Sequence, residues 1–204
     1  MSANKPVIIG LTGGIGSGKS EAARIIKNLG AVHVDADAIS RGLTAPGGEA
    51  LEAIREAFGD RVFLADGTLD RRALGEVVFQ DTAARHTLEG IIHPRVQRVT
   101  METVDAARES GAEAVLMDVP LLYETGMDAL CDVTWVIVAD LEQRIQRVMQ
   151  RDGLTREAVE QRMHSQMSDE DRARRATKVI HNDQSVEKLE SELTALYTQL
   201  VKNR

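Results

Sequence analysis

The stretch Gly13-Gly14-Ile15-Gly16-Ser17-Gly18-Lys19-Ser20 follows the pattern G-x-x-x-x-G-K-[ST] and decides the fold. The short β-branched run Val7–Leu11 precedes it, and apolar residues at helical spacing follow it from Lys19 to Leu29. It therefore joins a predicted strand to a predicted helix, where successive backbone N–H groups point at phosphate oxygens and glycine leaves the backbone room to curl. This context favours a phosphate-binding loop over the alternative, an ordinary glycine-rich turn.

The residues of this loop predict how a nucleotide would bind. Lys19 is expected to contact the β- and γ-phosphates of ATP, and the hydroxyl of Ser20 to bind Mg²⁺, a hard cation that takes oxygen ligands. Glu21 adds a negative charge in the first helical turn, which suits the helix dipole but repels phosphate. The residues predicted to bind ATP here are Gly13, Gly14, Gly16, Ser17, Gly18, Lys19, Ser20 and Glu21.

Asp35-Ala36-Asp37 follows the second predicted strand, 31–34, at the strand end where ligands bind in open α/β sheets. Asp35 is nearer the strand, so we predict that it is the general base that accepts the proton of an attacking hydroxyl. The alternative is that Asp35 or Asp37 only caps the next helix.

Asp118 follows an apolar run that starts at Ala114. In proteins with this kind of phosphate-binding loop, an aspartate at the end of such a strand binds the magnesium ion. A strand can also end in aspartate because the chain turns there, as Pro120 indicates. Because the same chain also contains the phosphate-binding loop, we favour the interpretation of Asp118 as a metal ligand.

Three arginines share one face of a predicted helix from Leu141 to Arg151: Arg144, Arg147 and Arg151. Such a stripe is usually a solvated helix face. An arginine that reaches a transferring phosphoryl group stabilises its charge, so the alternative is a lid over the nucleotide, which we favour for one or two of them.

The opening strand, helix and strand predict a β-α-β unit and hence a parallel sheet flanked by helices. Further strands are predicted at 114–119, 133–138 and 178–180, which makes five, and an amphipathic helix closes the chain. Between Arg41 and Gly111 the pattern is helical, with Pro94 opening a new helix. We predict one α/β domain with a core (1–40, 111–142 and 176–204), a helical acceptor-binding insertion (41–110) and a helical lid (143–175).

Composition limits the class of protein. The 204 residues carry a net charge of −7, which disfavours nucleic-acid binding because such proteins usually present a basic face. One cysteine excludes an internal disulfide, and neither a signal peptide nor a membrane span is evident, so a cytoplasmic protein without membrane partner is expected. The five histidines do not show zinc-ligand spacing, and composition does not indicate the oligomeric state.

From Val7 to about Asn182 the chain resembles the dephospho-coenzyme A kinase family. The matching pieces are Gly10–Ser20, Asp35-Ala36-Asp37 with Arg41, His93-Pro94, Asp118–Glu124, Arg147 and Arg151 in the lid helix, Gln166, and Asn182. Glu21, Arg144 and Thr177 depart from the residues common in the family, which are threonine, glutamine and aspartate.

The resemblance implies a P-loop kinase that uses ATP and Mg²⁺ to phosphorylate the 3′-hydroxyl of dephospho-coenzyme A, the last step of coenzyme A synthesis. By this carry-over Asp35, Lys19 and Arg147 are catalytic, Arg147 and Asn182 join the ATP site, and Ser20 and Asp118 bind the metal. The acceptor site would contain Asp35, Arg41, His93, Leu121, Leu122 and Glu124.

Two other functions would share part of this pattern. A P-loop kinase for a nucleoside monophosphate or a small sugar acid would share the loop and lid, and the long helical insertion argues against it. A nucleotide-dependent switch would also share the loop, but the sequence has no Asn-Lys-x-Asp motif for reading guanine.

Overall fold

The structure is a computed structural model that describes residues 5–202. It divides into two compact units, one combining the chain up to Val34 with the chain from Thr103 onward, the other comprising Asp35–Glu102. The predicted insertion covers 41–110, and residues 1–4 and 203–204 of the predicted core lie outside the described residues.

The first unit contains a five-stranded sheet, which confirms the predicted fold class. Its strands are β1 (Val7–Gly13), β2 (Val32–Asp35), β3 (Ala114–Asp118), β4 (Val133–Val138) and β5 (Lys178–His181). The order across the sheet is β2-β3-β1-β4-β5, and β1 pairs in parallel with both β3 and β4. The middle strand is therefore β1, with β3 and β4 beside it, and every residue of β1 and β3 is buried, as expected where helices cover both faces.

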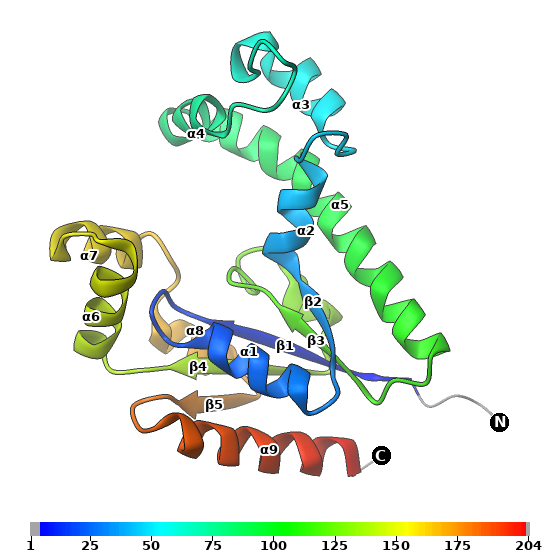
Figure 1. Cartoon of the computed structure of the whole chain (residues 1–204), viewed down its shortest axis with the longest axis vertical. Coiled ribbons are helices and arrows are strands. Elements are labelled where there is room, and N and C mark those ends of the chain that lie inside the picture. Colours follow the sequence, from blue (N-terminus) through cyan, green and yellow to red (C-terminus); the bar gives the residue numbers. More distant parts are fainter. Residues whose placement is uncertain (1–4, 203–204) are drawn as a thin grey trace. The chain divides into compact units, whose positions relative to one another are not determined.

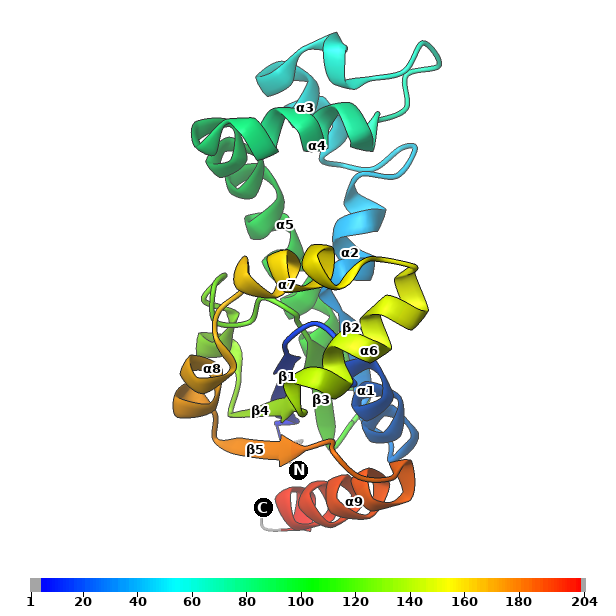
Figure 2. The ribbon, with the colours of Figure 1, turned by 90° about the vertical axis from the view of Figure 1, so that its left-hand side faces the viewer.

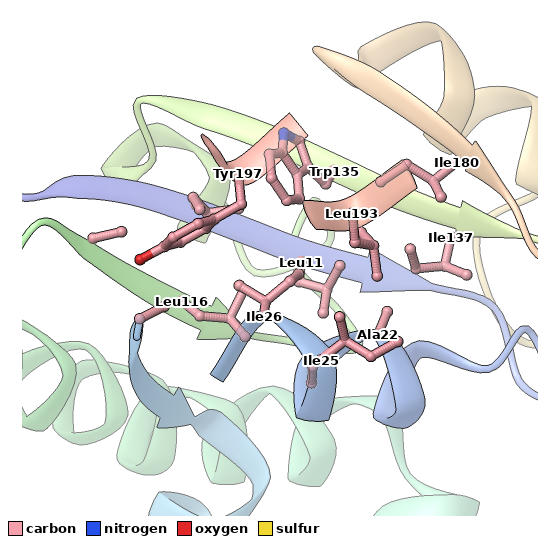
Figure 3. Packing of buried hydrophobic residues seen from close by; sticks show 14 of the residues in the cluster. Leu11, Ala22, Ile25, Ile26, Leu116, Trp135, Ile137, Ile180, Leu193 and Tyr197 are labelled. Atoms are coloured by element: carbon pink, nitrogen blue, oxygen red, sulfur yellow. The ribbon is translucent and has the colours of Figure 1, made fainter. Parts of the chain in front are cut away.

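Helices α1 (Lys19–Asn28) and α9 (Val186–Lys202) pack against this sheet (Figure 1). The predicted apolar stripes of both helices form one core with the strands (Figure 3). Each fully buried side chain of this kind contributes about 1.5–3 kcal/mol. The core labelled in the figure consists of Leu11, Ala22, Ile25, Ile26, Leu116, Trp135, Ile137, Ile180, Leu193 and Tyr197.

Between β4 and β5 the chain forms three helices, α6 (Leu141–Asp152), α7 (Arg156–His164) and α8 (Asp169–Arg175) (Figure 2). Each begins at a side chain that caps a backbone N–H, and two of these caps, Thr155 and Ser168, carry the hydroxyl that favours this position. A small apolar cluster of Ile145, Val148 and Val159 joins α6 to α7.

The second unit is helical, as the sequence predicts. It contains α2 (Ala36–Leu43), α3 (Leu51–Phe58), a 3₁₀ turn η1 (Asp60–Val62), α4 (Arg71–Gln80) and most of α5 (Thr82–Glu109). Its described residues hold one isolated β-bridge, between Phe63 and Leu69.

The prediction that Pro94 opens a new helix is wrong, because Pro94 lies inside the single helix α5. A proline within a helix lacks the N–H that would bond four residues back. In this turn the Arg95 guanidinium donates to the carbonyl of Ile91 at 2.7 Å, so a side chain supplies a donor beside the interruption. Although α5 has 28 residues, none of the helices within 5–202 combines the length and apolarity needed to cross a membrane.

Candidate active site

The loop between β1 and α1 requires glycine for two reasons. Gly16 and Gly18 have φ values of +79° and +91°, a region that residues with a Cβ rarely adopt. Gly13 has no room for a side chain, because its Cβ would lie 2.7 Å from the backbone carbonyl oxygen of Ile137. A Cβ at Gly14 would lie 2.5 Å from Nη2 of Arg144, so that side chain would have to shift. The predicted glycine pattern therefore reflects both conformation and close packing.

The backbone N–H groups of this loop fall into two sets. The N–H of Ser17 donates to the carbonyl of Gly14 at 3.1 Å, which closes a tight turn. The N–H groups of Gly16, Gly18, Lys19 and Ser20 have no hydrogen-bond acceptor within residues 5–202. They stand at the N-terminus of α1, where the helix dipole favours anions, so the loop can supply several donors to phosphate oxygens.

Lys19 and Asp118 meet at the end of the central strands. The Lys19 ammonium donates to Oδ1 of Asp118, and both side chains are largely buried. The other carboxylate oxygen, Oδ2, lies 3.3 Å from Nε2 of His33 on β2. Because an ammonium has three N–H donors, Lys19 retains two for a further anion.

Arg147 and Asn182 support the loop from its other side. The Asn182 amide donates to the carbonyl of Ser17 at 2.9 Å. The Arg147 guanidinium reaches the carbonyl oxygens of Gly16 at 3.4 Å and Asn182 at 3.1 Å, and the side chain of Gln143 at 3.1 Å. All three acceptors are neutral, so these hydrogen bonds leave the positive charge of Arg147 uncompensated.

Arg144 is also at the loop, although it departs from the family pattern. Its Nε donates to the carbonyl of Ile15 at 2.9 Å, and its Nη1 forms an ion pair with Asp169. The side chain is 7% exposed. Burial lowers the pKa of the Arg144 guanidinium, an effect that the charge of Asp169 opposes and that of Arg172 reinforces.

Two other predicted residues point elsewhere. The exposed Arg151 bonds to the carboxylate of Asp152 at 2.7 Å, which raises the pKa of its guanidinium. Glu21 accepts two hydrogen bonds from Arg24 on the same helix, which lower the pKa of its carboxyl group. The interpretation of the arginine stripe as a solvated face therefore describes Arg151 and not the other two arginines.

The segment after β3 contains three of the predicted acceptor residues. Leu121 is 43% exposed, whereas Leu122 is fully buried and would contact a Cβ at Gly10. The Glu124 carboxylate lies 3.5 Å from Nη2 of Arg172 and accepts from the N–H of Met167 at 3.3 Å. Glu124 thus connects to the segment between α7 and α8.

Three predicted residues belong to the second unit. Asp35 caps α2, with Oδ1 accepting from the N–H of Ala38 at 2.8 Å, and its Oδ2 lies 3.8 Å from Nη2 of Arg41. Capping therefore accounts for one of its carboxylate oxygens and leaves the other facing a guanidinium. His93 is exposed on α5.

The donor set suits magnesium better than a metal held by protein alone. Within 5–202, no three side chains among His, Cys, Asp and Glu gather closely enough to hold a metal ion. Mg²⁺ normally keeps several waters and takes one or two protein oxygens together with substrate phosphates. The hydroxyl of Ser20 and the carboxylate of Asp118 fit such a site.

Sequence reasoning did not identify three residues of this site: His33, Asp169 and Arg172. His33 contacts Asp118, Asp169 contacts Arg144 and Arg172 contacts Glu124, and each partner lies more than 20 residues away in the chain. No local sequence motif includes any of the three residues. Gln166, named only through the resemblance, accepts from the N–H of Ile15 at 3.1 Å.

Comparison with known proteins places the chain in one family. The family model described as Dephospho-CoA kinase matches residues 7–188. A Geobacter sulfurreducens protein named Dephospho-CoA kinase is 42% identical over 192 residues, covering 94% of this chain and 98% of that protein. A solved Thermus thermophilus structure has a TM-score of 0.84 at 38% identity, covering 97% of this chain and 99% of that one.

A solved structure titled as dephospho-CoA kinase from Campylobacter jejuni has a TM-score of 0.72 at 27% identity, covering 96% of this chain and 98% of that chain. Sequence and structural similarity therefore both extend over nearly the full length of this chain and of each protein compared with it. The chain belongs to the dephospho-CoA kinase family.

Proposed function

We propose that the protein transfers the γ-phosphoryl group of ATP to the 3′-hydroxyl of the ribose of dephospho-CoA, giving CoA and ADP as the last step of coenzyme A synthesis. The observation that carries this proposal is the loop from Gly13 to Ser20, with four backbone N–H groups free for phosphate oxygens in a chain of this family. Phosphoryl transfer depends mainly on positioning and on electrostatic stabilisation, which such a loop supplies.

On the donor side, Lys19 and Arg147 are the cations that we assign to the phosphates. Lys19 has two N–H donors left after its bond to Asp118, which suits contact with the β- and γ-phosphates. Arg147 reaches the carbonyl of Gly16 with its charge uncompensated, which suits a role in stabilising the charge of the transferring group. Asn182 holds the carbonyl of Ser17 and so fixes the loop that binds ATP.

Mg²⁺ would be held by the hydroxyl of Ser20 and the carboxylate of Asp118, in addition to phosphate oxygens. When bound, it would neutralise charge that develops on the phosphates. The bond from Lys19 keeps the Asp118 carboxylate next to the loop, and His33 contacts its second oxygen.

On the acceptor side, we assign Asp35 as the general base. Its Oδ2 takes the proton of the ribose 3′-hydroxyl as that oxygen attacks the γ-phosphorus, while the bond between this phosphorus and the β–γ bridging oxygen breaks and leaves ADP. The backbone bond to Oδ1 fixes the carboxylate without occupying Oδ2.

The remaining acceptor contacts that we propose are Arg41, His93, Leu121, Leu122 and Glu124. Arg41 and His93 are exposed basic side chains of the second unit and suit the anionic groups of the coenzyme. Leu121 is exposed enough to touch a ligand, whereas the fully buried Leu122 would act by supporting its neighbours.

A coupled assay of ADP release tests the proposal. Purified protein receives ATP and Mg²⁺ with dephospho-CoA, AMP, dCMP or gluconate in separate reactions, and a parallel set contains excess EDTA. We expect turnover with dephospho-CoA alone, and its loss with EDTA. Equal rates with any competing acceptor would reject the assignment, and slow hydrolysis that no acceptor stimulates would favour a nucleotide switch.

A further inference from the structure

The peptide units on both sides of Ile15 are held by side chains from outside the loop. Its carbonyl accepts from Nε of Arg144 on α6 at 2.9 Å. Its N–H donates to Oε1 of Gln166, in the segment between α7 and α8, at 3.1 Å. Figure 2 shows α6 and α7 near the loop that follows β1. The orientation of both peptides is therefore fixed from the segment 141–175.

Arg144 is itself fixed by Asp169, the first residue of α8. One carboxylate oxygen of Asp169 pairs with Nη1 of Arg144, and the other accepts from Nη1 of Arg172 at 3.1 Å. The side chain of Arg172 is 1% exposed, and its Nη2 lies 3.5 Å from Glu124. Asp169 is therefore a carboxylate between two buried guanidinium groups.

We infer that Arg144 and Asp169 form a positioning pair that holds the Gly14–Gly16 turn in the shape that binds the phosphates of ATP. Arg144 transmits the position of α8 to the carbonyl of Ile15, and the next N–H in the chain, that of Gly16, is one of the groups free for a phosphate oxygen. The inference rests on the proposed function, since it assigns a role in binding ATP.

The geometry predicts that the two members of the pair are not equivalent. Removing Arg144 leaves Asp169 paired with Arg172. Removing the charge of Asp169 leaves Arg172 with Glu124 at 3.5 Å but takes the carboxylate partner from the buried Arg144, and the two guanidinium groups then repel each other across a neutral amide. Loss of Asp169 should therefore disturb the loop more than loss of Arg144.

The test compares Arg144→Gln, Arg144→Lys and Asp169→Asn with wild type. None of the three replacements is larger than the original residue, and Arg144 and Asp169 line a cavity of about 400 Å³, so the variants fit without overpacking. Lysine retains an ion pair with Asp169 but lacks the separate Nε–H that holds Ile15. Arg156→Gln is the matched control, because Arg156 joins α7 to Glu142 of α6 through an exposed ion pair.

Isothermal titration with ATP and with dephospho-CoA gives both affinities, and thermal unfolding without ligand measures stability. We expect the Kd for ATP to rise about 10-fold in Arg144→Gln and Arg144→Lys and about 10²-fold in Asp169→Asn, because an unpaired buried charge costs more than one lost hydrogen bond. The Kd for dephospho-CoA should change less than about twofold, and the control should match wild type on every measure.

Full recovery of ATP affinity in Arg144→Lys would overturn the inference, because the ion pair alone would then suffice. Equal losses for both substrates, in proportion to a lowered Tm, would also overturn it in favour of a purely structural pair. Asp169→Asn is not essential to the decision, since the two Arg144 variants distinguish these outcomes if it fails to fold. A wild-type protein that binds and uses ATP while all variants match the control would reject the inference and keep the proposed function.

Discussion

Replacing Gly18 by alanine adds one methyl group at the most constrained point of the loop. At φ +91° an L-residue costs about 1–2 kcal/mol. The new Cβ would also overlap Nδ2 of Asn182, which must move and release its 2.9 Å hydrogen bond to the buried carbonyl of Ser17. An unsatisfied buried acceptor costs about 1–3 kcal/mol, so the total penalty is about 2–5 kcal/mol.

This penalty must appear either in folding or in binding. If the loop keeps its shape, the free energy of unfolding without ligand falls by the full amount and ATP affinity is preserved. If the loop relaxes to a different shape, stability is largely kept and ATP must restore the strained form. The Kd for ATP would then rise about 30- to 5,000-fold, since each 1.4 kcal/mol is tenfold. We therefore predict the sum of two losses, one in the free energy of unfolding and one in the free energy of ATP binding.

Urea unfolding without ligand and calorimetric titration with ATP together measure this sum. Gly153→Ala is the control, because Gly153 ends α6 at φ +66° with open space around its Cβ position and so isolates the conformational cost. We expect a loss of about 1 kcal/mol and unchanged ATP affinity for the control. A summed loss for Gly18→Ala no larger than that of Gly153→Ala would refute the reasoning from the Asn182 contact.

Three further predictions concern single side chains. Asp35→Asn should lower kcat by about 10²–10⁴ with ATP affinity kept, since asparagine can still cap α2, and an unchanged kcat in steady-state assays would reject Asp35 as the base. Lys19→Ala should weaken ATP binding and turnover together, whereas Lys27→Ala, an exposed lysine in the last turn of the same helix, should leave both unchanged. Burial, with Asp128 and Asp132 adding to it, raises the pKa of Cys131 to about 12. At pH 8 its thiolate fraction should be about 10³-fold lower than that of an ordinary thiol, so alkylation by iodoacetamide should be slower in the folded than in the urea-unfolded protein by about that factor.

Most of the fold could be predicted from the sequence because its signals are local. The glycine pattern, the switch from strand to helical spacing after Gly18 and the run from Ala114 to Asp118 each encode an element within a few residues, and the five-stranded sheet and the family are confirmed. Pro94 was predicted wrongly, because packing of the surrounding helix can outweigh the one hydrogen bond that a proline removes, and a local pattern does not show that packing.

In the candidate site, too, residues of a local motif could be predicted and residues brought together by the fold could not. Lys19 and Ser20 belong to one contiguous motif, so the sequence identifies them together. Arg144 and Asp169 are 25 positions apart, and the charge of each could equally belong to a solvated helix face, as that of Arg151 does. Only the three-dimensional arrangement distinguishes a buried guanidinium that holds a peptide from an exposed one that pairs with its neighbour.

A chain with a net charge of −7 must attract a polyphosphate through a local excess of positive charge, since its overall field opposes binding. Near the loop, the charge of Lys19 is offset by Asp118 and that of Arg144 by Asp169. Within residues 5–202 the hydrogen-bond acceptors of Arg147 are neutral carbonyl and amide oxygens, so Arg147 adds positive potential beside the N–H groups at the N-terminus of α1. Lys19 and Arg144 are each paired with a carboxylate, so we expect Lys19 to contact the phosphates with little net charge and Arg147 to contribute most of the positive potential at the loop.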